Sequence, residues 1–168
     1  VNKGQSSNDV IPTAIHLAAA SAIKDDLLPA IKELEGALLK KSRSFWPVIK
    51  TGRTHLQDAT PIRLGQEFLG YAGQMNLGQE RVIVALEELS TLAIGGTAVG
   101  TGVGMHPEFA ARIIEQLTNL TGLELTETPN HFQAQSTLDG VVAASGALKT
   151  VAVSLMKIAN DIRWLGSG

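Results

Sequence analysis

Residues 64–89 read LGQEFLGYAGQMNLGQERVIVALEEL, and the spacing of their apolar and small positions indicates one long helix. Steps of four and three residues alternate along the whole segment, which is the repeat of a helix that packs one side against other helices. The members of this predicted seam are Leu64, Phe68, Tyr71, Met75, Gly78, Val82, Ala85 and Leu89. We therefore expect a coiled-coil-like helix at the centre of the fold.

Two more long helices are predicted on either side of this segment. From Pro12 to about Lys41, apolar residues recur at three- and four-residue steps, and Pro29 should kink this helix because the pattern continues past it. The last helix should start at about Gln133, with the seam Leu138, Val141, Ser145, Leu148, Ala152, Leu155, Ala159 and Ile162. The sequence thus predicts an all-α fold, an elongated bundle of long antiparallel helices in one domain over residues 1–168.

Between the long helices lie shorter segments. Residues 94–104 contain too many glycines for a stable helix or strand, so we expect a loop. A shorter helix should run from Pro107 to about Leu120 and end at Thr121-Gly122. Several valines lie off the predicted seams, and oligomerisation would bury them.

Composition narrows the classes of function. The chain has 168 residues, a formal net charge of −2 and no cysteine. This charge favours neither a nucleic-acid nor an anionic-membrane partner, and we predict no membrane span. The absence of cysteine fits a reducing compartment. The four histidines are too far apart in the sequence for a histidine metal site, and the glycine-rich loop lacks a nucleotide-binding motif.

Two polar segments are candidates for chemistry. GQSSND at residues 4–9 precedes a helix N-terminus, where free backbone N–H groups favour an anion, although an ordinary helix cap has the same residue types. GRTHLQDATP at residues 52–61 has more hydrogen-bonding groups than a connection needs, and it contains a histidine, a residue type that can transfer protons near neutral pH. A lone loop histidine can equally be structural or merely exposed.

Two further segments belong with these: GGTAVGTG at residues 95–102 and SLMKIANDIR at residues 154–163. In their order and spacing, the four segments together resemble class II fumarase, of the fumarase/aspartase superfamily. The resemblance covers the whole chain and implies the central helical domain of a longer enzyme. It implies a carbon-oxygen lyase of the tricarboxylic acid cycle that reversibly hydrates fumarate to L-malate by anti addition, through a carbanion stabilised by a carboxylate. It implies no cofactor and no metal, and a homotetramer with active sites shared between three subunits.

The resemblance also implies roles for single residues. Ser6, Ser7, Asn8 and Thr54 are expected to bind a carboxylate of the substrate, and His55 to transfer a proton as the catalytic residue. The family's base-bearing loop and the glutamate that pairs with its histidine are not found in this chain. We therefore expect these 168 residues to be a fragment that is inactive by itself. The enzyme should be cytoplasmic, or mitochondrial in a eukaryote.

Two departures from the family pattern concern the surroundings of the site. Gly104 stands where members commonly have asparagine, and residues 130–133 read NHFQ where many read NKFE. Two alternatives remain: aspartate ammonia-lyase of the same superfamily, which usually has threonine in place of Ser7, and a non-catalytic helical structural protein.

Overall fold

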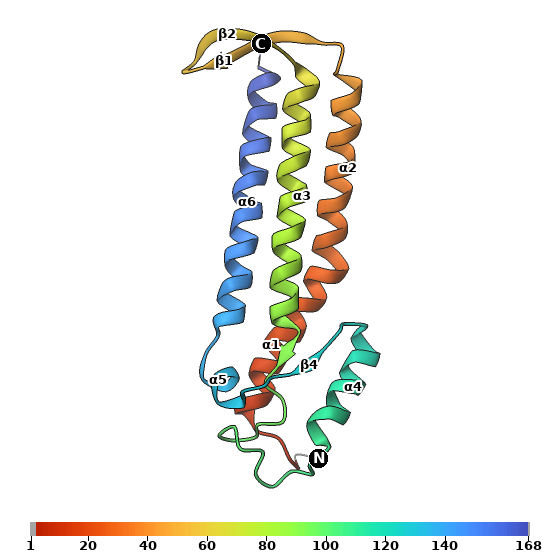
Figure 1. Ribbon diagram of the computed structural model, residues 1–168, viewed down its shortest axis with the longest axis vertical. Coiled ribbons are helices and arrows are strands. Elements are labelled where there is room, and N and C mark those ends of the chain that lie inside the picture. Colours follow the sequence, from red (N-terminus) through yellow and green to blue (C-terminus); the bar gives the residue numbers. More distant parts are fainter. Residues whose placement is uncertain (1–2, 168) are drawn as a thin grey trace. The chain divides into compact units, whose positions relative to one another are not determined.

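The computed structural model describes residues 3–167 and divides into two compact units. One unit consists of Val1–Leu27 and Val82–Ala147, and the other of Leu28–Arg81 and Leu148–Gly168. Within residues 3–167, nearly all regular structure is helical, apart from one hairpin and one two-residue pair of strands, so the predicted all-α class is confirmed (Figure 1). Whether residues 1–168 form one domain stays a prediction.

The first predicted long helix is interrupted before its proline. Helix α1 spans Ser7–Ala22, a π-helix follows at Ile23–Leu27, and helix α2 spans Leu28–Ser44. Pro29 lacks an N–H group and its ring displaces the carbonyl one turn earlier, so a widened turn just before it is the physical counterpart of the predicted kink.

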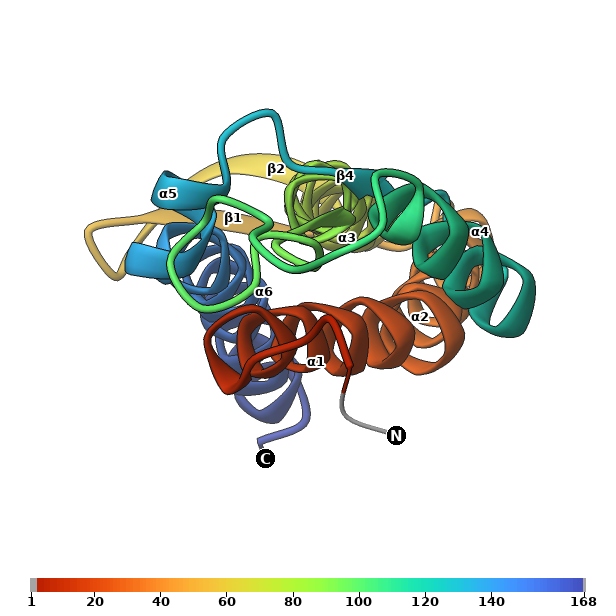
Figure 2. The same cartoon turned by 90° about the horizontal axis from the view of Figure 1, so that it is seen from below.

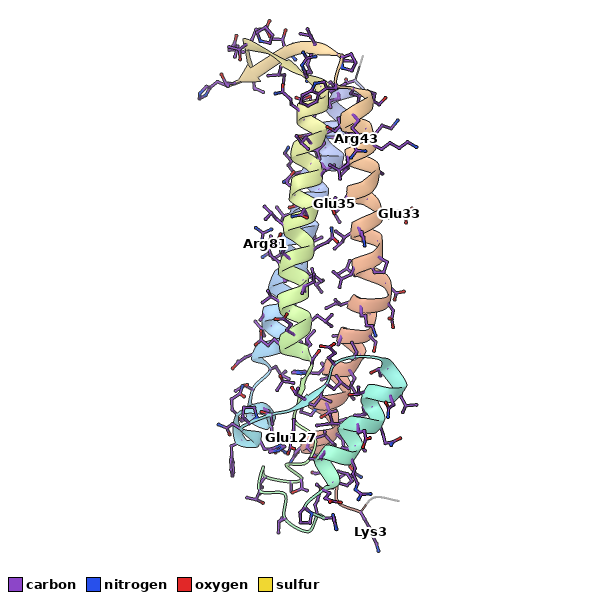
Figure 3. All side chains as sticks on the ribbon, turned by 45° about the vertical axis from the view of Figure 1, so that its right-hand side comes forward. Lys3, Glu33, Glu35, Arg43, Arg81 and Glu127 are labelled. Carbon is purple, nitrogen blue, oxygen red and sulfur yellow. The ribbon has the colours of Figure 1, made fainter. Side chains whose placement is uncertain are left out.

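The unit containing α2 is built from three helical segments and a hairpin. Its segments are α2, the beginning of α3 (Leu64–Leu89) and the end of α6 (Asp139–Leu165), with α3 running opposite to the other two (Figure 1). Glu35 on α2 accepts a hydrogen bond of 2.6 Å from Gln79 on α3, and Figure 3 shows Glu35 between these helices. The apolar core of this unit consists of Ile31, Leu38, Phe68, Tyr71, Ala72, Met75, Val151 and Ile158.

The predicted seam of α3 is confirmed. From Phe68 to Leu89, every seam residue is buried, while Leu64 at the start of the helix is half-buried. Aromatic side chains continue the packing at this end, because the Phe68 ring meets those of Phe45 and Tyr71 edge-on at centroid distances of 5.1 and 5.4 Å.

The other unit contains the first helix and most of the loops. Strand β3 (Thr91–Leu92) follows α3 and pairs in parallel with β4 (Thr126–Glu127), and helix α4 spans Phe109–Thr121 between them. The predicted end of α4 is confirmed, since Gly122 has a left-handed φ of 63° and its N–H bonds back to Thr118.

The last helix begins later than the sequence predicts. A separate short helix, α5, spans His131–Ser136, and α6 begins only at Asp139. Thr137 between them is extended, with φ −131° and ψ 164°, and its hydroxyl bonds to Gln133. Threonine competes for backbone groups in this way, which explains the break in an otherwise continuous pattern.

Apart from the half-buried Val141, the predicted seam of α6 is exposed. Leu148, Leu155 and Ile162 are exposed, whereas Val151 and Ile158 are buried on another side of the helix. Helix α6 is also long and apolar enough to cross a membrane by length and composition, and 17% of the 18-residue stretch that meets this criterion is buried. This criterion is weak evidence by itself, because core helices of soluble proteins meet it too.

Candidate functional site

The segment Ser6–Asn8 lies at the beginning of α1. Ser6 is the N-cap residue, with extended φ and ψ of −138° and 158°, and its side chain accepts a hydrogen bond of 3.3 Å from the Asn8 backbone N–H. Ser7 and Asn8 are exposed, and Ser6 is half-buried. Two hydroxyls and an amide are therefore available at a helix N-terminus, where the backbone dipoles favour a negatively charged ligand.

The glycine-rich loop lies directly beside this segment (Figure 2). The side-chain amide of Asn8 donates a hydrogen bond of 2.6 Å to the Ala98 carbonyl, and the buried Asp9 carboxylate accepts from the Gly95 and Thr97 N–H groups. From the sequence, Asp9 is only the last residue of the GQSSND segment, whose residue types are also those of an ordinary helix cap. The capping pair of Ser6 and Asp9 was visible in the sequence, but the loop that shares this carboxylate was not.

The polar candidate segment at residues 52–61 lies in a β-hairpin, which the sequence does not predict. Strand β1 spans Ile49–Thr54 and strand β2 spans Gln57–Arg63, paired antiparallel with an irregularity between Thr51 and Arg53. Its strands are mostly polar and one contains Pro61, so they lack the alternation that indicates a strand. Close turns between strands also usually contain glycine or asparagine, and this one does not.

Thr54 and His55 lie at the tip of the hairpin. His55 and Leu56 have left-handed φ values of 51° and 60° and connect Thr54 to Gln57, its partner across the strands. The side chains of Thr54 and His55 are exposed, so both can meet a ligand that approaches from outside. One pair of residues away from the tip, Arg53 and Asp58 form an exposed ion pair of 3.1 Å.

The base of the hairpin is joined to the helices of its unit. Lys50 on β1 forms an ion pair of 2.9 Å with Glu67 on α3, and Arg63 donates a hydrogen bond of 2.9 Å to the Trp46 carbonyl. These contacts hold the base of the hairpin while its tip is exposed.

A second polar cluster lies beside this base, between α3 and α6. Lys157 lies 2.6 Å from Asp161 and 4.5 Å from the centre of the Tyr71 ring. Burial and a hydrogen bond to Asp161 raise the pKa of Tyr71, and the hydrogen bond from Lys157 holds the pKa of Asp161 below its usual value. Sequence reasoning missed this cluster, although the four-residue spacing of Lys157 and Asp161 on one helix was a signal for their pairing.

The two groups of predicted site residues belong to different units of the chain. Ser6, Ser7 and Asn8 belong to the unit of α1, and Thr54 and His55 to the unit of α2. A surface cavity of about 540 Å³ near α4 contains none of these residues. Its lining consists of His106, Glu108, Phe109, Arg112, Ile113 and Gln116.

The other histidines have structural contacts. His16 Nδ1 lies 3.0 Å from the Thr91 carbonyl, and the ring of His131 lies between the Ala93 carbonyl at 3.0 Å and Glu127 at 2.8 Å. His131 thus joins β4, α5 and the residue after β3. Among residues 3–167, no three histidine, aspartate or glutamate side chains come together in an arrangement that could hold a metal ion.

Comparison with known proteins places these features in one family. A sequence model of the lyase family matches residues 1–168. The chain is 56% identical over 168 residues to a class II fumarate hydratase of Neisseria meningitidis, and 55% identical over 169 residues to one of Mycobacterium tuberculosis. Each alignment covers 100% of this chain and 36% of the relative, so the chain spans little more than a third of their length.

Solved structures agree with the sequence relatives. The class II fumarase of Schistosoma mansoni superimposes with a TM-score of 0.96 at 37% identity, covering 99% of this chain and 38% of that one. A fumarate lyase/delta crystallin of Brucella melitensis bound to cobalt superimposes with a TM-score of 0.91 at 39% identity, covering 99% and 36%. The chain therefore belongs to the lyase family, and over its whole length it is similar to class II fumarate hydratases.

Proposed function

We propose that this chain is the central helical part of a fumarate hydratase that reversibly adds water to fumarate to form L-malate. The observation that carries the proposal is the Ser6–Asn8 segment at the N-terminus of α1, with Ser7 and Asn8 exposed, in a chain 56% identical to a class II fumarate hydratase. Hydroxyl, amide and backbone N–H donors suit a carboxylate, and the substrate is a small dicarboxylate.

The chemistry requires donors of this kind. When a proton leaves the carbon next to a carboxylate of L-malate, negative charge moves onto that carboxylate in a carbanion intermediate. Hydrogen-bond donors that are already in place stabilise this charge without reorganising. Ser6, Ser7 and Asn8 bind the substrate carboxylate in this proposal, and Thr54 supplies a further hydroxyl. The reaction needs no cofactor and no metal.

His55 is the proposed proton-transfer residue. In the dehydration of L-malate, the leaving hydroxyl takes a proton and departs as water; in hydration, a water molecule gives up a proton as its oxygen bonds to carbon. An imidazole can perform both transfers near neutral pH. The position of His55 at an exposed hairpin tip supports this role, because its ring is open to a ligand. The base that removes the carbon-bound proton is proposed to lie outside these 168 residues.

The active enzyme is proposed to be a homotetramer whose sites are shared between three subunits. Exposed site residues in two units, together with the exposed apolar side of α6, support this arrangement. The 168-residue chain by itself should then not convert malate. We place the enzyme in the cytoplasm, or in mitochondria in a eukaryote, because a chain without cysteine suits a reducing compartment.

The test is an assay of the full-length parent protein with L-malate and, separately, with L-aspartate. Formation of fumarate from malate, followed by the ultraviolet absorbance of its double bond, supports the proposal. Formation of fumarate from aspartate alone would identify an ammonia-lyase, and no reaction with either would indicate a non-catalytic protein. Turnover of malate by the isolated 168 residues would refute their predicted inactivity.

A further inference from the structure

Asp9 is a buried carboxylate with two separate sets of partners. Its exposed fraction is 0%, its Oδ1 accepts a hydrogen bond of 2.9 Å from the Ser6 N–H, and its Oδ2 accepts from the N–H groups of Gly95 and Thr97 at 3.2 and 3.0 Å. A buried charge is costly unless hydrogen bonds satisfy it. Here they do, and the two oxygens join the start of α1 to a loop far away in the sequence.

The loop is also held from its other side. Thr97 is buried, has a left-handed φ of 59°, and its carbonyl accepts a hydrogen bond of 2.7 Å from the Gln135 side chain on α5. A side chain on Gly96 would collide with Gln135, so the loop and α5 are in close contact at this point. The backbone of Thr97 is therefore fixed at its N–H by Asp9 and at its carbonyl by Gln135.

The next loop residue contacts the candidate site. The Asn8 side chain donates its hydrogen bond of 2.6 Å to the Ala98 carbonyl, directly after Thr97. The orientation of the Asn8 amide therefore depends on where the loop backbone lies. That position in turn depends on Asp9, which also holds the backbone of Ser6.

We propose that Asp9 is a positioning residue of the substrate-carboxylate site, which holds Ser6–Asn8 and the loop 95–98 in one geometry. This inference rests on the proposed function, in which Ser6, Ser7 and Asn8 bind a substrate carboxylate. Asp9 does not contact the ligand itself. Both of its oxygens accept hydrogen bonds from backbone N–H groups, so the carboxylate of Asp9 is satisfied within the protein and acts only on the backbone of the site.

Asp9→Asn is the most informative variant. An asparagine has the same shape but only one acceptor oxygen, and its NH₂ group would face an N–H on one side. Either the Ser6 bond or the two loop bonds must therefore be lost. In the full-length parent, we expect the KM for L-malate to rise about tenfold or more and kcat to fall as well, because the same donors bind the carboxylate and stabilise the charge that develops on it.

A binding measurement separates positioning from simple stabilisation of the fold. Succinate has both carboxylates of the substrate but no group to eliminate, so its Kd, measured by calorimetry, reports carboxylate binding without turnover. We expect this Kd to rise by the same factor as the KM. Asp26→Asn is the matched control, because it removes one carboxylate from an exposed position in the same unit and should leave both constants unchanged.

The outcomes separate this inference from the proposed function. A wild-type parent that does not interconvert malate and fumarate refutes the proposed function. An active parent whose Asp9→Asn variant binds succinate normally refutes this inference alone, even when the variant melts at a lower temperature. If Asp9→Asn does not fold, Gln135→Met releases the Thr97 carbonyl while Asp9 stays in place. A raised succinate Kd in that variant supports the inference, and an unchanged Kd overturns it.

Discussion

His55 and Leu56 have backbone conformations that residues other than glycine rarely adopt. Their φ values of 51° and 60° bring the two strands of the hairpin together in a two-residue connection. Leu56 is 93% exposed, so packing of its side chain does not compensate for this strain. Strained backbone of this kind often occurs at functional positions, and here it lies beside the proposed proton-transfer residue.

Leu56→Gly tests this strain through stability. The left-handed conformation costs a side-chain-bearing residue about 1–2 kcal/mol, while glycine costs about 0.5–1 kcal/mol through the greater freedom of the unfolded chain. We expect the free energy of unfolding, measured with urea, to stay the same or rise by up to about 1 kcal/mol. Leu120→Gly is the control, because that leucine is 82% exposed within α4 and its replacement should destabilise by about 1 kcal/mol. Equal destabilisation by both variants contradicts the prediction.

His55→Asn tests the catalytic assignment in the full-length parent. Asparagine tolerates a left-handed φ, so the hairpin tip should keep its conformation while the imidazole is lost. We expect kcat for malate dehydration to fall about a hundredfold or more, as for the loss of a general acid-base group, with an unchanged circular dichroism spectrum. His106→Asn, which replaces another exposed histidine, should retain kcat. Near-normal turnover by His55→Asn would refute the role of His55.

Helices α3 and α6 show how far the periodicity of a sequence predicts packing. Both have alternating steps of three and four residues, and in α3 the predicted seam is buried from Phe68 to Leu89. In α6 the side that includes Val151 and Ile158 is buried instead, and the seam that includes Leu155 is exposed. Periodicity identifies the apolar sides of a helix, but the neighbouring elements decide which of these sides packs within the same chain. For a helix that is apolar on two sides, the sequence pattern alone therefore does not predict the buried side.

Only part of the candidate site can be predicted from the sequence. Ser6–Asn8 follows from the capping chemistry of helices, and the structure places it at a helix N-terminus as expected. The hairpin that carries Thr54 and His55 was missed because neither its strands nor its turn has the usual residues. The sharing of Asp9 with the glycine-rich loop depends on a contact between residues 86 and 88 positions apart, which local patterns do not contain.

The contact between α3 and α6 near the hairpin predicts an unusual titration. Tyr71 is the single tyrosine of the chain, so the absorbance of its ionised form can be followed without ambiguity. Burial first, and then the hydrogen bond to Asp161, raise its pKa. We expect little ionised tyrosine at about pH 10, where an exposed tyrosine is half ionised, and a normal titration after unfolding in denaturant.

Asp161→Asn is the variant that separates the two causes. Loss of the anionic acceptor should lower the pKa of Tyr71, but burial should still keep it above about 10.

Because the folded-state pKa is raised, Tyr71 stabilises the fold fully below about pH 10 and loses this effect as the pH rises further. The pKa of Asp161 is lowered by Lys157, so its contribution is present above about pH 4 and is lost as the pH falls. A wild-type titration at the ordinary tyrosine pKa contradicts this account.

For the molecule as a whole, the exposed side of α6 has the greatest consequence. Leu148, Leu155 and Ile162 recur at seven-residue steps and remain exposed within the chain. A regular apolar repeat of this kind is typical of a helix that packs against another helix. The proposed tetramer would cover this side of α6 and could also bring site residues of different subunits together. Assembly and activity should therefore depend on each other.

Leu155→Lys in the full-length parent tests this dependence. Each buried leucine side chain contributes about 1.5–3 kcal/mol, and a lysine at that position would also place a charge in an apolar contact in each of the proposed subunits. We expect analytical ultracentrifugation to show a tetramer for the wild type and smaller species for the variant, with malate turnover falling in parallel. Leu120→Lys on α4, an exposed leucine outside the repeat, should leave both mass and turnover unchanged. Dissociation of the variant with full activity would show that the sites do not depend on assembly, and an intact tetramer would show that this side of α6 is not the contact.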